Sequence, residues 1–257
     1  MSIDQPFAEL PRALAGGRFS DVRFVAEATS TNELIAPFLG NSGEPGVTIV
    51  TDFQHRGAGR KGREWLADPG SSLLFTTAIP DPIAAAHVWA VPFWAALAVR
   101  DALRETGIEV CLQWPNDILV GSAKLCGILC LSRVTGALAW AACGIGINVH
   151  RPREPSAAIV PTPAFVADLA PISRESLLEN ILRRFEATLP DLRDPQAVAR
   201  NWESAAGLPG ARYRILVDGE TQAFEATALS LARDGALVVE SNGTQREISL
   251  ADARVLR

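Results

Sequence analysis

The sequence predicts an α+β fold, in which a large domain of strands and helices is followed by a small C-terminal β domain. Short apolar or alternating runs between residues 22 and 149 indicate strands, and amphipathic patterns between residues 176 and 206 indicate helices. After residue 207, hairpin turn signals separate several short strand patterns. The chain has 257 residues, of which 48% are hydrophobic, so it can bury a sizeable core; disorder, collagen and coiled coil are excluded.

The first half of the chain is predicted to be rich in strands, with two helices. Residues 29–32, Thr-Ser-Thr-Asn, are typical of a helix start, so a short helix is expected over residues 33–39. A longer helix is expected over residues 84–105, bent near Pro92 because proline lacks the N–H that a helix interior needs. Strands are predicted over residues 22–28, 47–53, 73–79, 109–113, 118–120, 125–132 and 137–149.

A proline-rich stretch at residues 151–163 predicts a loop, and two helices are expected to follow it. The segment Ser176-Leu177-Leu178-Glu179 fits a capping box that opens the first of them. The second helix is expected over residues 195–206. The apolar face of the first helix is predicted to consist of Leu178, Ile181, Leu182, Phe185 and Leu189.

The segment Gly207-Leu208-Pro209-Gly210 predicts a boundary between a domain of residues 1–206 and a domain of residues 207–257. About 50 residues of short strands suit a small SH3-like barrel. Hairpin turns are predicted at Asp218-Gly219, Asp234-Gly235 and Asn242-Gly243, and strands over residues 213–217, 223–229, 236–240 and 246–250.

Charge and hydropathy disfavour several classes of function. The net charge is −5 and basic residues form no long run, which disfavours bulk binding of nucleic acid. Residues 1–20 carry charges and lack the apolar stretch of a signal peptide. The longest apolar stretch, residues 83–99, contains His87 and Pro92 and is shorter than the ~20 residues that a bilayer-spanning helix needs. A cytoplasmic protein without membrane contact is therefore expected.

Cysteine usage predicts a reducing compartment and no disulfide framework. The cysteines are few and are expected to be small core residues. A zinc site is disfavoured because the histidines do not supply tight ligand spacing. The residues concerned are Cys111, Cys126, Cys130 and Cys143, together with His55, His87 and His150.

A glycine-rich, cationic segment at residues 54–65 is the first candidate for chemistry. Residues 57–62 match the dinucleotide fingerprint G-x-G-x-x-G, but the following Asp68-Pro69-Gly70 leaves no room for the long helix that this fingerprint requires. The cations instead favour a flexible loop that folds over an anionic ligand, with a solvated surface turn as the alternative. These cations are Arg56, Arg60, Lys61 and Arg63.

Three further segments are candidates, each with a plain structural alternative. Residues 113–117, Gln-Trp-Pro-Asn-Asp, predict a tight turn, whose amide and carboxylate could also bind a hydroxyl or a phosphate-bound Mg²⁺. Lys124 is one of only two lysines in the chain, and it either extends to solvent or points into a site. Gly144 and Gly146 interrupt an apolar strand, which indicates either local packing or close approach of a ligand.

Five motifs follow one another between residues 22 and 150. They are Ser30-Thr31-Asn32, Gln54-x-x-Gly57-x-Gly59-Arg60-x-Gly62-Arg63-x-Trp65, Trp114-Pro115-Asn116-Asp117, Lys124-x-x-Gly127-Ile128-Leu129 and Gly144-x-Gly146-x-Asn148. In this order they resemble the biotin–protein ligases. The resemblance implies a class II synthetase-like biotin/lipoate ligase core, with a mixed, mostly antiparallel sheet flanked by helices, and a small C-terminal SH3-like β barrel.

The resemblance also implies a two-step reaction. ATP and biotin, the substrate, form biotinyl-5′-AMP with Mg²⁺ as the accompanying metal, and the biotin is then transferred to a lysine of a biotin carboxyl carrier protein. That carrier belongs to acetyl-CoA carboxylase or a similar carboxylase. Neither DNA nor a membrane is expected as a binding partner. A homodimer is left open.

The same resemblance assigns roles to individual residues. Lys124 and Arg60 are the expected catalytic residues, because their charges would offset the repulsion between two anions and stabilise charge on the α-phosphate. Biotin contacts are expected from Ser30, Thr31, Asn32, Gln54, Gly57, Ala58, Gly59, Arg60, Lys124, Gly127, Gly144 and Gly146. ATP contacts are expected from Arg60, Arg63, Trp65, Asn116, Asp117, Lys124 and Asn148, with Asp117 as the ligand of Mg²⁺ on the phosphates.

Two positions depart from the family pattern. Ala58 stands where the family loop usually has arginine, and Gln113 stands where it usually has lysine before Trp-Pro-Asn-Asp. Both replacements remove a cation near the expected ligand and leave a non-catalytic biotin-binding module as an alternative. A lipoate or octanoate ligase of the same superfamily is a second alternative. A bifunctional ligase-repressor is disfavoured, because only about 20 residues precede the first core strand, too few for a winged helix-turn-helix.

Overall fold

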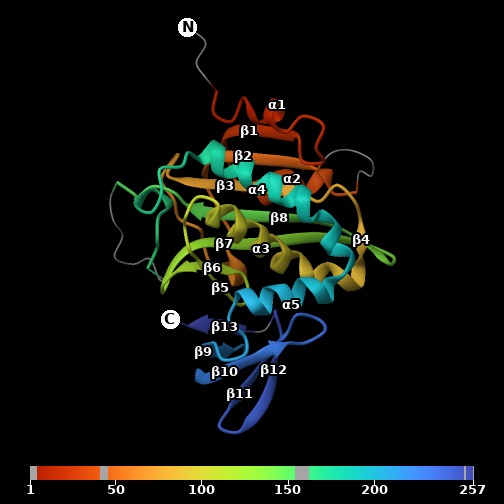
Figure 1. Ribbon diagram of the computed structural model, residues 1–257, viewed down its shortest axis with the longest axis vertical. Helices are drawn as coiled ribbons and strands as arrows, with labels where there is room; N and C mark the ends of the chain where they lie inside the picture. Colours follow the sequence, from red (N-terminus) through yellow and green to blue (C-terminus); the bar gives the residue numbers. More distant parts are fainter. Residues whose placement is uncertain (1–4, 41–45, 154–161, 252, 257) are drawn as a thin grey trace.

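The central layer of the molecule is an eight-stranded, mixed and mostly antiparallel sheet, as predicted (Figure 1). The computed structural model describes residues 5–40, 46–153, 162–251 and 253–256. The strand order is β1-β2-β3-β8-β7-β6-β5, with β4 paired to β8. Only β1 (Asp21–Ala28) and β2 (Val47–Gln54) are paired in parallel among the described strands. The others are β3 (Ser72–Ala78), β4 (Ile83–Ala84), β5 (Cys111–Gln113), β6 (Asp117–Val120), β7 (Ala123–Thr135) and β8 (Leu138–Asn148).

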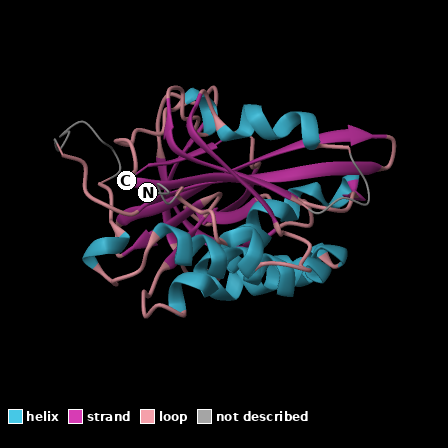
Figure 2. Cartoon of the chain, turned by 90° about the horizontal axis from the view of Figure 1, so that it is seen from above, coloured by secondary structure: helices cyan, strands magenta, loops and turns pink. Residues whose placement is uncertain are grey.

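Helices cover both faces of this sheet (Figure 2). Three long helices pack together on one face, where the Trp94 and Phe185 rings stack at 4.5 Å and the Phe93 and Trp202 rings meet at 5.0 Å. The helices are α1 (Leu10–Ala13), α2 (Thr31–Ile35), α3 (Val91–Arg104), α4 (Arg174–Thr188) and α5 (Pro195–Ala205). Short 3-10 helices are η1 (Ala36–Phe38), η2 (Arg60–Gly62), η3 (Ala85–Ala90), η4 (Val166–Asp168) and η5 (Leu189–Arg193).

The helix predicted over residues 84–105 is interrupted near Pro92, as expected, but the prediction of one continuous helix is wrong. The 3-10 helix η3 ends at Ala90, and α3 begins at Val91 with Pro92 in its first turn. Proline suits that position, because the first N–H groups of a helix have no partner within the helix. One long pattern in the sequence therefore corresponds to two helices.

The predicted capping box of α4 is also wrong by three residues. The helix begins at Arg174, and the Ser173 side chain accepts a hydrogen bond from the Ser176 N–H. Leu177, which was left out of the predicted apolar face, is fully buried. Leu189 lies beyond the helix, at the start of η5.

A second, five-stranded antiparallel sheet lies below the first in Figure 1. Asn242 and Gly243 both have positive φ angles (51° and 75°), as a two-residue hairpin turn requires. Buried residues of this sheet, such as Ile215 and Leu237, belong to the same hydrophobic core as α3 and α5. Its order is β12-β11-β10-β9-β13, made of β9 (Arg212–Val217), β10 (Phe224–Leu231), β11 (Leu237–Ser241), β12 (Thr244–Ile248) and an unpredicted β13 (Ala253–Leu256).

The cysteines are free thiols, but they are not all core residues. Cys126 and Cys143 are buried, and burial raises the pKa of the Cys126 thiol. Cys130 is half-buried, whereas Cys111 is exposed, so the core prediction is wrong for that residue. Among the described residues, no helix has the length and apolar character needed to cross a bilayer.

Candidate active site

A cavity of about 680 Å³ opens beside the ends of β2, β7 and β8. Its walls come from the start of α2, the loop after β2, the turn before β6 and the two long central strands. Every residue to which the sequence assigned a biotin or ATP contact lines this one cavity. They are Ser30, Thr31, Asn32, Gln54, Gly57, Ala58, Gly59, Arg60, Arg63, Trp65, Asn116, Asp117, Lys124, Gly127, Gly144, Gly146 and Asn148.

A buried polar network forms one end of the cavity. The Thr31 N–H and hydroxyl both donate to Gln54 Oε1, at 2.7 and 3.1 Å. The Thr76 hydroxyl lies 2.8 Å from the Thr31 hydroxyl and 2.7 Å from Asn32 Oδ1. Ser30 is the N-cap residue of α2, but its side chain makes no capping hydrogen bond. These short polar groups stand in an otherwise apolar wall, the usual arrangement for orienting a small ligand.

Glycines on the two central strands let side chains approach the sheet closely. Gly127 and Gly146 face each other across β7 and β8, and the Trp65 ring lies against both. A Cβ atom on Gly146 would stand 2.8 Å from that ring, and a Cβ on Gly144 only 2.2 Å from Asn32 Oδ1. Real Cβ atoms essentially never come this close. These glycines therefore shape the cavity floor, and the groups that approach them are the Asn32 and Trp65 side chains, as the local-packing interpretation predicts.

The glycine-rich segment folds as a closed hairpin, which we call the cation hairpin (residues 57–65). The Trp65 N–H donates to Gly57 O at 2.8 Å, and the Gly59 N–H donates to Arg63 O at 2.7 Å. Lys61 (φ 57°) and Gly62 (φ 70°) form the tip, both with left-handed backbone. Gly57 is needed because the returning strand passes close to it: a Cβ atom there would stand 2.6 Å from Trp65 O, whereas one on Gly59 would stand 3.3 Å from Arg63 O.

Lys124 reaches the cavity because of an irregularity in strand pairing. Asp117 pairs with Gly127, but Leu119 pairs with Lys124, so β7 carries one extra residue there. Such a bulge turns the following side chains to the other face of the sheet. It places Lys124 on the same face as Asp117, and its Nζ lies 2.8 Å from Asp117 Oδ1. Both side chains are largely buried, at 20% and 16% exposure.

The Trp65 side chain lies near Lys124. Its ammonium is 5.4 Å from the centre of the Trp65 ring, within the range of a cation–π contact. The Trp65 Nε1 is buried and has no hydrogen-bond partner among the described residues. A buried donor without a partner is costly, so this N–H is suited to donate to a ligand.

Arg60 lines the same cavity from the hairpin side. Its guanidinium donates to the backbone oxygen of Leu250, which lies beyond β12 in the C-terminal sheet. Burial lowers the pKa of Arg60, while the carboxylates of Asp117 and Asp218 act in the opposite direction. Arginine stays charged under such conditions. Arg60, Lys124 and Arg63 therefore make the cavity suitable for an anionic ligand.

Asp117 is the predicted Mg²⁺ ligand, and its carboxylate is already paired with Lys124. No group of three His, Cys, Asp or Glu side chains within the described ranges could hold a metal ion. Mg²⁺ in nucleotide sites is commonly held by one or two carboxylates and by substrate phosphates. A single carboxylate fits that arrangement, so the metal role of Asp117 stays a prediction.

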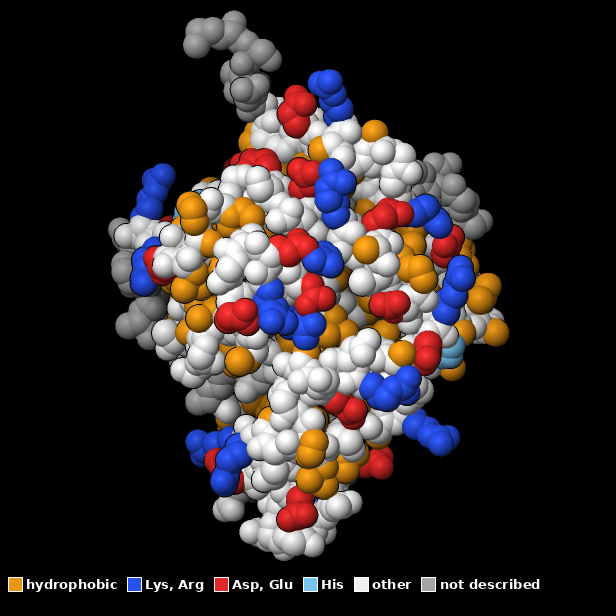
Figure 3. Space-filling model, viewed as in Figure 1, with side chains coloured by type: hydrophobic (Ala, Val, Ile, Leu, Met, Phe, Trp, Pro, Cys, Tyr) orange, Lys and Arg blue, Asp and Glu red, His pale blue; other side chains and the backbone are white. Residues whose placement is uncertain are grey.

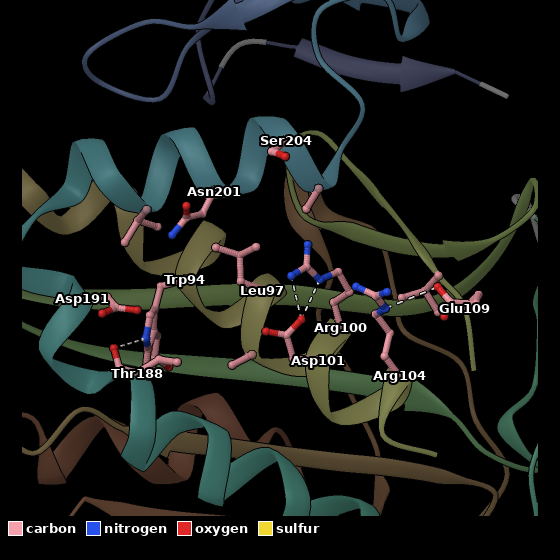
Figure 4. A pocket seen from close by; sticks show the side chains of 14 residues that line it. Trp94, Leu97, Arg100, Asp101, Arg104, Glu109, Thr188, Asp191, Asn201 and Ser204 are labelled. Carbon is pink, nitrogen blue, oxygen red and sulfur yellow. Dashed lines mark hydrogen bonds and ion pairs between the residues drawn. The ribbon is translucent and has the colours of Figure 1, made fainter. Parts of the chain in front are cut away.

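A second hollow, of about 600 Å³, lies on the helical side between α3 and α5 (Figure 4). Its arginines already have carboxylate partners: Arg100 pairs with Asp101 at 2.7 Å and Arg104 with Glu109 at 3.4 Å. None of the residues of the five motifs lines it. The first cavity is therefore the candidate active site.

The sequence missed some residues at this site and misjudged another. Thr76, a fully buried threonine on β3, orients both Thr31 and Asn32. A polar residue inside the apolar run of residues 73–79 is the signal that could have found it. Phe165 and His150 also line the cavity. Ala58 lies on the wall as expected, but Gln113 is not among the lining residues, so the lysine missing there removes no direct wall contact.

Comparison with known proteins finds relatives of this chain. A family model described as the biotin/lipoate A/B protein ligase family matches residues 26–148. A biotin--[acetyl-CoA-carboxylase] ligase of Mycobacterium tuberculosis is 28% identical over 95% of this chain and 92% of its own length. The bifunctional ligase/repressor BirA of Bacillus subtilis is 27% identical over 87% of this chain and 70% of its own length.

Among solved structures, a biotin protein ligase from Aquifex aeolicus in complex with biotin and ATP has a TM-score of 0.73. It is 23% identical in sequence, and the match covers 92% of this chain and 100% of that one. This likeness shows that the two chains share a fold. Residues 26–148 match the model of the biotin/lipoate A/B protein ligase family, and the similarity to the ligase of Mycobacterium tuberculosis extends over 95% of the chain.

Proposed function

We propose that this protein activates the carboxylate of biotin with ATP and transfers biotin to a lysine of a biotin carboxyl carrier protein. One observation carries the proposal. A polar network around Thr31 and Gln54 and a charged cluster around Lys124 lie in one cavity of about 680 Å³. The first suits a small ring with hydrogen-bonding groups, and the second suits a carboxylate and phosphates.

In the first step, a carboxylate oxygen of biotin attacks the α-phosphorus of ATP. The bond between the α-phosphorus and its bridging oxygen breaks, and pyrophosphate leaves. Lys124 offsets the repulsion between the two anions and stabilises the charge that develops on the α-phosphate. Asp117 holds the Lys124 ammonium in place, and Arg60 adds a second cation from the cation hairpin. When bound, Mg²⁺ neutralises phosphate charge, and Asp117 is the residue that would contact it.

In the second step, the ε-amine of the carrier lysine attacks the acyl carbon of biotinyl-5′-AMP. The bond from that carbon to the phosphate oxygen breaks, AMP leaves, and the amine loses a proton. The adenylate is sensitive to water, so the ligand must be covered until the carrier arrives. The cation hairpin, which carries Trp65 onto the cavity floor, is the segment suited to this task.

Pyrophosphate release, measured with biotin and then with lipoate under matched ATP and Mg²⁺, tests the proposal. We expect release with biotin and, with a competent carrier domain present, labelled carrier. Release with lipoate alone would assign the chain to the lipoate branch of the family. Binding of biotin without pyrophosphate release would instead identify a non-catalytic biotin-binding module.

We also propose that the protein acts on its carrier in the cytoplasm and does not bind DNA as a repressor. On the face seen in Figure 3, acidic and basic side chains are intermixed, and the net charge is −5. A DNA-binding face needs a basic patch that neutralises phosphates. A gel shift with operator-like duplexes at physiological salt should show no complex at submicromolar protein.

A further inference from the structure

The tip of the cation hairpin is tied to the C-terminal sheet at two points. The Lys61 Nζ lies 2.5 Å from Asp218 Oδ2, in the loop that follows β9. The neighbouring Arg60 donates to Leu250 O after β12. These contacts join residues that are 157 and 190 positions apart in the chain. The wall of the candidate active site is thus connected directly to the second sheet.

The backbone of Lys61 adopts a conformation that is unfavourable for a lysine. Its φ of 57° and ψ of 39° are left-handed, a conformation that costs roughly 1–2 kcal/mol for a residue with a Cβ atom. Its side chain is only 13% exposed, so the ammonium lies against Asp218 rather than in open solvent. The Lys61 ammonium is neutralised by Asp218 while the Lys61 backbone is left-handed. Together these features indicate that the contact between Lys61 and Asp218 determines the shape of the hairpin.

The second sheet also supports the motif that carries Asp117. The Trp114 N–H donates to the Tyr213 hydroxyl at 3.2 Å, and the Trp114 indole donates to Gly235 O at 3.3 Å. Trp114 is fully buried. Two separate parts of the cavity wall, the cation hairpin and the turn before β6, therefore rest on the same C-terminal sheet.

We propose that Asp218 is a positioning residue, which holds the cation hairpin over the cavity through Lys61 and so determines how tightly the triphosphate binds. This inference rests on the proposed function. Asp218 itself does not line the cavity, so it acts through Lys61 and Arg60. The carboxylates near Arg60 are Asp117 within the cavity and Asp218 behind the hairpin, and only Asp218 pairs with the hairpin tip.

The simplest contrary view is that this is an ordinary surface ion pair with little effect. Asp218 is 53% exposed, which favours that view. The buried Lys61 side chain, its left-handed backbone and the adjacent Arg60 contact distinguish the pair from an ordinary one. The chain supplies a matched control in the pair of Glu220 and Arg246, 2.6 Å apart on the same sheet and at 38% and 40% exposure.

The test compares Asp218→Asn with Glu220→Gln in the full chain. We expect Asp218→Asn to raise the KM for ATP about fivefold, the upper end for one exposed ion pair, with the KM for biotin within about twofold. Glu220→Gln should match the parent. Lys61→Met should reproduce Asp218→Asn, and the double variant should be no worse than either single variant, because both remove one interaction.

A second measurement does not depend on activity. Limited trypsin digestion, with fragments mapped by mass spectrometry, reports cleavage after Arg60, Lys61 and Arg63. Asp218→Asn should speed this cleavage about fivefold, while Glu220→Gln should not. Equal cleavage rates and equal KM values for ATP in the two variants would overturn the proposal. If the parent makes no biotinyl-5′-AMP, the proposed function fails, yet the cleavage rates still decide the role of Asp218.

Discussion

Two cationic regions face the same cavity, and they are supported in opposite ways. Lys124 stands on β7 in the middle of the large sheet, and its partner Asp117 stands on the neighbouring strand β6. Arg60 and Lys61 stand on a hairpin whose partners belong to another sheet. A charge on a central strand is fixed before the ligand arrives, which suits the stabilisation of a developing charge. A charge on the hairpin is held by contacts with the second sheet, so its position over the cavity depends on how that sheet packs.

The comparison predicts the largest effect for Lys124→Ala. Single-turnover formation of biotinyl-5′-AMP should fall by about 10² to 10³, the usual cost of losing one preorganised electrostatic group. Lys124→Arg should lie between this variant and the parent, since the wider planar guanidinium fits a closed pocket poorly. Adenylate formation by Lys124→Ala at the parent rate would contradict the mechanism and move the main electrostatic role to Arg60.

Lys124→Ala also leaves the largely buried Asp117 without its cation, so a loss of stability must be separated from a loss of chemistry. The double variant Lys124→Ala/Asp117→Asn removes both charges of the pair. Its free energy of unfolding should be closer to that of the parent, because a buried charge left alone is more costly than no pair. Its rate should stay low. Recovery of both stability and rate would mean that the lysine is structural.

Gly144→Ala is expected to have the next largest effect, on biotin binding. The new Cβ would stand 2.2 Å from Asn32 Oδ1 and 2.8 Å from Leu129 O, so the Asn32 side chain must move out of the polar network. Overpacking of this kind costs about 1–3 kcal/mol, so biotin affinity should fall by about 5- to 150-fold. Isothermal titration with biotin measures it.

The control for Gly144→Ala is a double-mutant cycle with Asn32→Ala. Removing the Asn32 side chain removes the closest clash and leaves only the one with Leu129 O, so the two changes together should cost less stability than the sum of the single changes. Strictly additive losses of stability would show that the close approach of Asn32 is not the cause.

Trp65→Phe should have a smaller effect, because it keeps an aromatic side chain facing Gly127 and Gly146, although it removes the indole N–H together with one ring of the bicyclic system. That buried donor has no described partner in the protein, so its loss is expected to matter only when a ligand is bound. We expect the affinity for biotinyl-5′-AMP to fall about fivefold, typical of one lost hydrogen bond. Unchanged affinity in competition binding would mean that the N–H does not reach the ligand.

Lys61→Arg should have the smallest effect, less than about twofold on the KM for ATP. Arginine keeps the charge that Asp218 needs, and the left-handed backbone is equally available to it. The same substitution at Lys124 should be clearly harmful. If both arginine variants behaved alike in steady-state kinetics, the distinction between the strand-borne and hairpin-borne cations would not hold.

Much of the site could be predicted from the sequence, because local patterns carry it. Glycines within an apolar strand marked the close approaches at Gly144 and Gly146, and the turn signals marked the hairpins of the C-terminal sheet. Helix ends were predicted less well. Pro92 and Ser176 are each compatible with more than one place in a helix, and only packing decides which place is used.

The sequence by itself indicated most of the strand segments along the chain, the small residues of the cavity floor and the identity of the charged side chains. Tertiary structure alone decided where those charges point. Lys124 faces Asp117 because β7 gains one residue relative to β6, and a shift of one residue exchanges the two faces of a strand. Lys61 meets Asp218 only because the second sheet packs beside the first. Such contacts join distant parts of the chain, so no local pattern can specify them.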